Sequence, residues 1–209
     1  MSLYLIFDFD GVIGDTYETS IASHLQYGSR STRESAIAEM NEYFNKMPNH
    51  TRNHTKSAEE MTAMTKWTIE FGKIVHTIGF PLFDEFVKTI EAIDTPYKAI
   101  VSSGSHVYVA PALARTNINP THTLAFEDHH SKEEKIESIC RDWGVTPEDV
   151  YYFTDSLADV YELENFISPG KLIGVAWGFS GKENLCKELP EKYILDIPSD
   201  ITKVLPQTF

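Results

Sequence analysis

Two pairs of aspartates each follow a short apolar run. Asp8 and Asp10 lie at the end of one run, and Asp155 and Asp159 lie directly after another. Residues two apart in a strand point the same way, and residues four apart in a helix share a face. If both runs are strands of one parallel sheet, the four carboxylates meet at its carboxyl edge, where they repel one another unless a cation lies among them. Oxygen ligands favour Mg²⁺, so the pattern predicts a magnesium site. Taken singly, each stretch also fits a turn or a helix cap.

A third apolar run ends in a segment rich in hydroxyl groups. Ile100–Val101 is followed by Ser102, Ser103 and Gly104, and then by Ser105 at a predicted helix start. Hydroxyls and backbone N–H groups at the start of a helix form a natural seat for an anion. The segment therefore predicts a phosphate-binding loop, with a serine-rich helix cap as the alternative.

A lysine near the start of a later helix is placed to reach the same edge. The capping box Ser131–Glu134 opens this helix, whose apolar face includes Ile136 and Ile139. At 100° per residue, Lys132 falls within ~40° of Ile136, whereas Lys135 lies about 100° away, at the edge of that face. A cation at a helix N-terminus opposes the helix dipole and gains little there. Lys132 is therefore the better candidate for a lysine aimed at the site, and Lys135 is the other.

The elements that must position these residues alternate along most of the chain. Short apolar runs separated by helical stretches are typical of an α/β fold, a Rossmann-like parallel sheet with helices on both faces. The predicted strands are Leu3–Asp8, Ala99–Ser102, Thr123–Phe126, Val150–Thr154, Leu172–Trp177 and, more weakly, Tyr193–Leu195.

Residues 15–79 differ from this alternation because they are predicted to be helical. Ser31–Glu34 and Ser57–Glu60 match the capping box. After the second box, a methionine and aromatic stripe that includes Trp67 and Phe71 recurs at helical spacing and predicts core packing. The polar segment Met47–Lys56 predicts a loop. We expect an inserted all-α cap over residues 15–79, lying above the carboxyl ends of the strands, and a core of residues 1–14 and 80–209.

Composition narrows the classes of function. The chain has 209 residues, 42% hydrophobic and 23% charged, with 18 basic and 31 acidic residues and a net charge of −13. This excess of acid argues against nucleic acid as a partner. No apolar run approaches the ~18 residues of a membrane span, and the first one is too short for a signal peptide. We expect a cytoplasmic location and no membrane partner, whereas the oligomeric state cannot be deduced from the sequence.

The motifs in this order resemble the haloacid dehalogenase-like hydrolase superfamily, and the resemblance extends along the whole chain. Asp8–Val12 resembles the first motif, Ser102 the second, Lys132 the third and Asp155–Asp159 the fourth. Gly174–Gly178 resembles the fifth strand of phosphoglycolate-phosphatase-like members, and the helical block resembles a type 1 cap.

The chain departs from the family pattern in three places. Thr154 stands where a glycine usually precedes the fourth motif, Lys132 lacks the proline that commonly follows it, and Pro111 should shorten or kink the helix after the second motif. None of these departures removes a reacting group.

The resemblance implies a Mg²⁺-dependent phosphatase acting on a small phosphorylated metabolite. Asp8 would be the nucleophile that forms an aspartyl-phosphate, and Asp10 would be the general acid and base. Mg²⁺ would be held by the Asp8 carboxylate, the Asp10 backbone carbonyl and Asp155. An aspartate at position 10 points to phosphate esters, because dehalogenases and phosphonatases of this superfamily lack an acid there.

The remaining roles are implied in the same way. Ser102, with nearby N–H groups at Ser103 and Gly104, would bind the phosphoryl oxygens. Lys132 would steady Asp8 and the transferring charge, and Asp159 would orient Lys132 or a metal-bound water.

Two other functions remain open at this point. A phosphomutase of the same fold would use the same residues and return the phosphoryl group to a sugar, with His24 in the cap as a candidate acid or base. A non-catalytic binding or regulatory protein is the second alternative. The polar loop holds His50, Arg52, His54 and Lys56. In a phosphatase or a phosphomutase these residues would contact an anionic part of the substrate, and the alternative is that they are simply solvated.

Overall fold

Six short apolar segments form one parallel sheet in the computed structural model, which describes residues 2–45 and 56–206. The strand order is β3-β2-β1-β4-β5-β6, and each neighbouring pair is parallel. All six predicted strands are present, so the expected Rossmann-like sheet is confirmed. The strands are β1 (Tyr4–Phe7), β2 (Tyr97–Val101), β3 (His122–Leu124), β4 (Tyr151–Thr154), β5 (Leu172–Val175) and β6 (Ile194–Leu195).

The connections between strands are helical. The described residues contain α1 (Tyr17–Tyr27), α2 (Arg33–Asn45), α3 (Ala58–Ile78), α4 (Asp84–Ala92), α5 (His106–Leu113), α6 (Lys132–Trp143), α7 (Leu157–Leu163), α8 (Gly181–Leu185) and α9 (Ile201–Val204). Pro111 lies inside α5, which is only 8 residues long, as its ring and missing N–H lead one to expect.

Alternate residues of the strands feed two separate cores, one on each face of the sheet. On one face, Leu5 and Phe7 pack with side chains of α4, α5 and α9. On the other face, Ile6 packs with side chains of α6, α7 and α8. This two-sided burial explains why the central strands are continuous apolar runs rather than alternating ones.

The register of the central strands brings the predicted site to one edge. Phe7 pairs with Ile100 on one side and with Phe153 on the other. β1, β2 and β4 therefore end at nearly the same level, and the residues that follow them emerge together. This is the physical reason why motifs more than ninety residues apart in the sequence meet.

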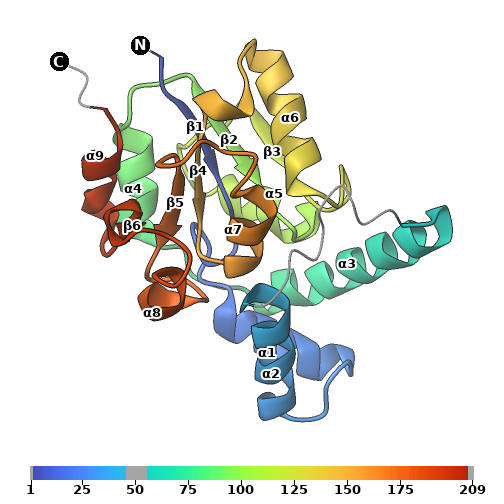
Figure 1. Ribbon diagram of the computed structural model, residues 1–209. Helices are drawn as coiled ribbons and strands as arrows, with labels where there is room; N and C mark the ends of the chain where they lie inside the picture. The colour runs from blue at the N-terminus through green and yellow to red at the C-terminus, as the bar shows by residue number, and fades with distance from the viewer. Residues whose placement is uncertain (1, 46–55, 207–209) are drawn as a thin grey trace.

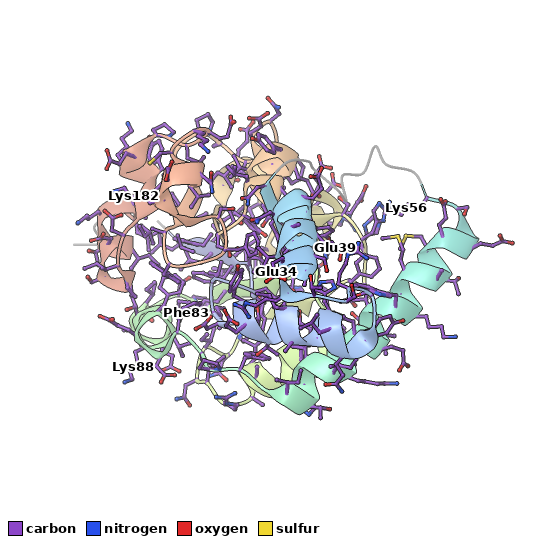
Figure 2. The ribbon with its side chains drawn as sticks, turned by 90° about the horizontal axis from the view of Figure 1, so that it is seen from below. Glu34, Glu39, Lys56, Phe83, Lys88 and Lys182 are labelled. Atoms are coloured by element: carbon purple, nitrogen blue, oxygen red, sulfur yellow. The ribbon has the colours of Figure 1, made fainter. Side chains whose placement is uncertain are left out.

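Helices α1, α2 and α3 form the predicted helical insertion between β1 and β2. Figure 1 shows them below the sheet, at the end opposite to the two chain termini. Seen from below, α2, which carries Glu34 and Glu39, lies across the middle of the molecule, whereas Lys88 and Lys182 lie on the side away from α3 (Figure 2). The division into core and cap at residues 14/15 and 79/80 stays a prediction.

Two details of the cap differ from the sequence analysis. The box expected at Ser31–Glu34 lies one residue later, where Thr32 and Ser35 exchange hydrogen bonds of 3.2 Å, while the box at Ser57 and Glu60 is formed as expected. The buried positions of α3 are Thr68, Gly72 and Val75, and Trp67 is 39% exposed, so the stripe is only partly core. Gly72 lets α3 approach α5 closely, because an added Cβ at this position would meet the side chain of Ser105 at 2.7 Å.

No helix in the described part of the chain is both long enough and apolar enough to cross a membrane.

Candidate active site

An ion pair buried at the carboxyl edge of the sheet is the centre of the candidate site. The Nζ of Lys132 donates to Asp8 Oδ2 at 2.7 Å and to Asp159 Oδ2 at 2.5 Å. The Lys132 side chain is only 2% exposed. Asp8 follows β1 directly, and its Oδ1 accepts the backbone N–H of Phe9 at 2.7 Å. The structure therefore brings together three of the predicted residues.

Several polar groups fix the position of Lys132. Asp159 Oδ2 also accepts hydrogen bonds from Thr154 at 2.7 Å and from Tyr152 at 3.2 Å, which orients the carboxylate that faces the lysine. The first turn of α6 is held by Glu162, whose Oε1 accepts the Lys132 N–H at 2.7 Å. Thr154, which departs from the family pattern, thus takes part in the network.

Asp10 lies beside this pair, with its carboxylate turned toward α5. Its Oδ2 accepts hydrogen bonds from Tyr108 Oη at 2.8 Å and from Ser102 Oγ at 3.3 Å. Gly104 is needed here because an added Cβ would overlap the Tyr108 hydroxyl and lie 2.9 Å from Asp10 Oδ2. The second motif therefore contacts the first motif directly.

The predicted phosphate-binding loop leaves the end of β2. Ser102 is fully buried, and its Oγ accepts the N–H of Gly104 at 2.8 Å, which forms a tight turn. Ser103 and Gly104 are half-buried, and α5 begins two residues later, at His106. N–H groups of such a turn at a helix start can bind an oxyanion.

Asp155 lies on the other side of the first motif, before α7 begins at Leu157. It therefore does not share a helix face with Asp159, as the spacing alone had suggested. Its Oδ2 accepts the N–H of Phe179 at 2.5 Å. Added Cβ atoms at Gly11 and Gly178 would both overlap Asp155, so these two glycines form a close cradle for the carboxylate.

Both candidate lysines are buried, which the helical-face analysis did not predict. Lys132 contacts Asp8, as expected, but Lys135 is also only 1% exposed. Its Nζ donates to the carbonyl of Ser102 at 2.6 Å and to that of Ala125 at 3.3 Å. The expectation that Lys135 lies at the edge of the apolar face is therefore wrong, because the amine reaches inward to these carbonyls.

The titration of these groups follows from burial and from their neighbours. Burial raises the pKa of Asp8 well above its usual value. Burial alone would lower the pKa of Lys132, but the carboxylates of Asp159 and Asp8 outweigh it and raise that pKa, so the ammonium stays protonated. Burial raises the pKa of Asp10 too, against the opposing hydrogen bonds from Tyr108, Thr16 and Ser102.

The oxygen atoms around Asp155 fit a hard divalent cation. Burial raises the pKa of Asp155 to about 7, and no cationic side chain of the described residues lies within 4.0 Å of it. Three His, Cys, Asp or Glu side chains do not converge in metal-binding geometry within residues 2–45 and 56–206. The expected ligand set uses only two carboxylates, Asp8 and Asp155, with the Asp10 carbonyl as the third oxygen, and these are the donors that Mg²⁺ prefers.

Three residues of this network were missed by the sequence analysis. Tyr108 on α5 and Glu162 on α7 lie outside the motifs identified in the sequence, and Thr154 was noted only as a departure from a family pattern. A polar residue in an otherwise apolar strand end, as at Thr154, is a signal that could have been used. Nothing in the sequence around Tyr108 or Glu162 marks the partner that each one finds.

The cap contacts the core close to the site. The C-terminal end of α2 meets the start of α7, where Ser156 Oγ donates to the Phe44 carbonyl at 3.2 Å. Ser180 Oγ donates to Asn45 Oδ1 at 2.6 Å, and the rings of Phe44 and Phe179 lie 4.6 Å apart. Of the proposed substrate-contacting loop, His50, Arg52 and His54 lie outside the described residues, and Lys56 lies two residues before the start of α3.

His24, the candidate acid or base of the mutase alternative, is built into the packing of the cap. Its ring lies 4.8 Å from that of Phe71, and its Nδ1 is hydrogen-bonded to Ser29 Oγ at 2.9 Å. Burial lowers the pKa of His24. These contacts are those of a packed histidine within the cap.

The fold and the site together define a class of α/β protein with an acidic, lysine-containing site at the sheet edge beneath a helical insertion. Residues 5–162 match the family model described as haloacid dehalogenase-like hydrolase. The chain belongs to this family of hydrolases. The suspected relationship is thus confirmed over more than half of the sequence. No curated protein matches the chain.

Solved structures of similar fold support the same architecture. A predicted phosphoglycolate phosphatase from Haemophilus somnus is 15% identical, with 97% of each chain covered and a TM-score of 0.67. A predicted phosphatase from Clostridium acetobutylicum has the same values. A haloacid dehalogenase-like family hydrolase from Streptococcus pneumoniae is 14% identical, with 96% of this chain and 97% of that chain covered and a TM-score of 0.62. At these identities the likeness concerns the fold.

Proposed function

We propose that this hydrolase is a Mg²⁺-dependent phosphatase that cleaves a small phosphomonoester through an aspartyl-phosphate on Asp8. The observation that carries the proposal is the buried Lys132 ammonium held between Asp8 and Asp159, with Asp10 on the same edge. A carboxylate nucleophile, an adjacent acid and a fixed positive charge are the parts that phosphoryl transfer requires.

The Asp8 carboxylate would attack phosphorus, and Lys132 favours its ionised form against the effect of burial. The lysine lies 2.7 Å from Asp8 Oδ2, so it opposes protonation of the nucleophile and stabilises charge that develops on the transferring group. Asp159 holds the lysine from its other side and thereby keeps the ammonium oriented. Ser102 and the N–H groups of Ser103 and Gly104 would bind the phosphoryl oxygens.

Asp10 would move the proton. Burial raises its pKa, so that the acid can protonate the leaving oxygen. The hydrogen bonds from Tyr108 and Ser102 then stabilise the carboxylate, which can take a proton from the water that hydrolyses the aspartyl-phosphate. One group thus serves both half-reactions.

Mg²⁺ would be held by the Asp8 and Asp155 carboxylates and the Asp10 carbonyl, and when bound it would neutralise charge between nucleophile and phosphate. Its binding would also remove the unfavourable burial of the Asp155 carboxylate, which Gly11 and Gly178 confine. The net charge of −13 makes such a local positive site necessary for an anionic substrate.

The decisive experiment measures free phosphate released from a generic monoester and from phosphoglycolate, which the name of the Haemophilus somnus relative suggests. We expect release with Mg²⁺ and none with EDTA. Asp8→Asn should lose at least about a thousandfold in rate, as expected for a nucleophile. The exposed Asp84→Asn is the matched control and should keep full activity. Equal activity in Asp8→Asn and the wild type would refute the proposal.

The same assay distinguishes the alternatives. A phosphomutase would convert a sugar phosphate into an isomer without releasing phosphate, which product analysis detects. A binding protein would show neither reaction, and Asp8→Asn would leave its properties unchanged. The packed position of His24 does not favour the mutase.

A further inference from the structure

The hydrogen-bond ladder between β2 and β3 is interrupted at Ser102. The ladder continues past the pair Val101 and Leu124 with a bond from the Ser102 N–H to the Leu124 carbonyl at 2.8 Å. The bonds of a regular parallel ladder are evenly spaced. The next bond would therefore run from the Phe126 N–H to the Ser102 carbonyl. This N–H donates instead to the Gly104 carbonyl at 2.9 Å. The segment 102–104 therefore bulges out of the sheet, and the Ser102 carbonyl loses its ladder donor.

The side chain of Lys135 supplies the missing donor. Its Nζ lies 2.6 Å from the Ser102 carbonyl oxygen and 3.3 Å from that of Ala125, the residue after β3. One amine thus joins the ends of both strands at the point where their ladder opens. The contact comes from α6, one turn beyond Lys132, so one helix holds both the nucleophile and the phosphate-binding loop.

This arrangement is costly as a purely structural device. Lys135 is 1% exposed, and no carboxylate of the described part of the chain lies within 4.0 Å of its Nζ. An ammonium buried without an ion pair is unfavourable. Burial and the neighbouring Lys132 accordingly lower the pKa of Lys135 to about 7. An apolar side chain would fill the same space at a lower free-energy cost of burial, but it would leave the bulged carbonyl unpaired.

We propose that Lys135 is a positioning residue that holds the bulged segment 102–104 in the shape that binds the phosphoryl group. It acts through the Ser102 peptide, whose hydroxyl contacts Asp10 at 3.3 Å and the Gly104 N–H at 2.8 Å. Lys135 itself does not touch the reacting atoms. This inference rests on the proposed phosphatase function, because it assigns the anion seat to the same loop.

The test compares Lys135→Met with Lys98→Met. Methionine is unbranched and close to lysine in volume, but it is one atom shorter and donates no hydrogen bond. Lys98 is the matched control, because it is a buried lysine on β2, away from the site. Binding of inorganic phosphate is measured by calorimetry with saturating Mg²⁺, well below the melting temperature. We expect Kd to rise about tenfold in Lys135→Met, as for one lost hydrogen bond to an oriented loop, and to be unchanged in Lys98→Met.

Turnover provides a second readout that a merely structural role would not move. In Lys135→Met, KM should rise by a larger factor than kcat falls, because the loop that binds phosphate is affected and the nucleophile is not. An unchanged phosphate Kd and KM would overturn the inference, even if the melting temperature fell. If Lys135→Met does not fold, Lys135→Gln replaces it, because its shorter amide keeps a polar group but ends before the Ser102 carbonyl, and the same criteria apply.

The two proposals fail in different ways. If the wild type hydrolyses esters and Lys135→Met binds phosphate equally well, only the role of Lys135 is refuted. If the wild type releases no phosphate from any ester yet binds inorganic phosphate less tightly after Lys135→Met, the phosphatase proposal fails and the loop assignment stands. A wild type that neither binds phosphate nor hydrolyses an ester refutes both.

Discussion

Tyr108 lies on α5, 98 residues along the chain from Asp10, and donates a hydrogen bond of 2.8 Å to its Oδ2. The phenol is 6% exposed, and the ring packs in the core beside Phe9 and Phe80. Core packing therefore fixes the direction of the hydroxyl. A hydrogen bond from a rigid donor stabilises the ionised form of Asp10 and lowers its pKa from what burial alone would impose.

Tyr108→Phe should lower kcat by about 10- to 100-fold, the value of one hydrogen bond to a charged group. The pKa of Asp10 should rise further, so the limb of the pH–rate profile that Asp10 sets should move to higher pH. This is the alkaline limb where Asp10 acts as the acid and the acidic limb where it acts as the base. Steady-state kinetics over a pH series measures both effects. Tyr161→Phe, which removes a surface hydrogen bond to Glu188, is the control and should leave the profile in place. If neither limb moves in Tyr108→Phe, this role is excluded.

Gly178→Ala tests the cradle around Asp155. The added Cβ would overlap Asp155 and lie 2.5 Å from the Gly11 carbonyl, so the carboxylate must move. We expect the stabilisation by Mg²⁺ in thermal unfolding to be lost, together with activity. Gly174→Ala is the comparison, because its methyl meets only side-chain carbons at 3.2 Å and beyond. Retention of the Mg²⁺-dependent shift in Gly178→Ala would show that Asp155 does not hold the ion.

At the scale of the elements, the start of α6 is the part that most needs support. Lysines at positions 132 and 135 both point inward from its first two turns, against the helix dipole. Glu162 on α7 compensates, because its Oε1 accepts from the N–H groups of Lys132 and Glu133 and from the Ser131 hydroxyl. The Ser131 hydroxyl in turn caps the helix by accepting the Glu134 N–H at 3.3 Å.

Glu162→Ala should lower the free energy of unfolding by about 1–3 kcal/mol, because it leaves buried N–H groups unpaired. It should also lower kcat, since Lys132 loses its anchor. Glu162→Gln, which keeps one acceptor oxygen, should be milder in both respects. Urea unfolding and steady-state kinetics measure the two effects, and the exposed Glu164→Ala serves as control. A loss of stability without any change in kcat would mean that Glu162 only caps the helix.

At the scale of the whole molecule, the buried amine of Lys135 should make stability depend on pH. Its pKa is about 7 in the folded protein, against an ordinary value of 10.5. Between these values the unfolded chain binds a proton that the folded chain does not, so this contribution to the free energy of unfolding rises with pH from about 7 to 10.5. Below pH 7 both states are protonated and the contribution is constant. The charged groups that face the amine are Lys132, Glu162, Asp8 and Asp159.

Chemical denaturation in EDTA from pH 6 to 10 measures the difference in unfolding free energy between the wild type and Lys135→Met. Subtraction cancels the groups that both proteins share. We expect the difference to grow in favour of the wild type above about pH 7 and to be flat below it. Two curves that stay parallel over the whole range would mean that Lys135 keeps its proton.

The sequence by itself determined the sheet, the helical insertion and the set of residues at the edge. Apolar runs such as Leu3–Phe7, separated by helical stretches, are typical of buried parallel strands, and parallel strands bring their carboxyl ends to one edge. The meeting of Asp8, Asp10, Ser102 and Asp155 therefore follows from local pattern and topology. The choice of Lys132 as the residue that contacts Asp8 also followed from helical geometry.

Only the tertiary structure decided the partners that come from other elements. Tyr108 and Glu162 reach the site through packing directions that local periodicity does not encode. The burial of Lys135, the other candidate lysine, was not predicted for the same reason. A helical wheel measures an angle to an apolar face and cannot register a carbonyl left without a donor by a bulge in the neighbouring ladder. Such unpaired groups exist only once the strands are paired. Because a buried carbonyl without a donor costs free energy, another group must then donate a hydrogen bond to it.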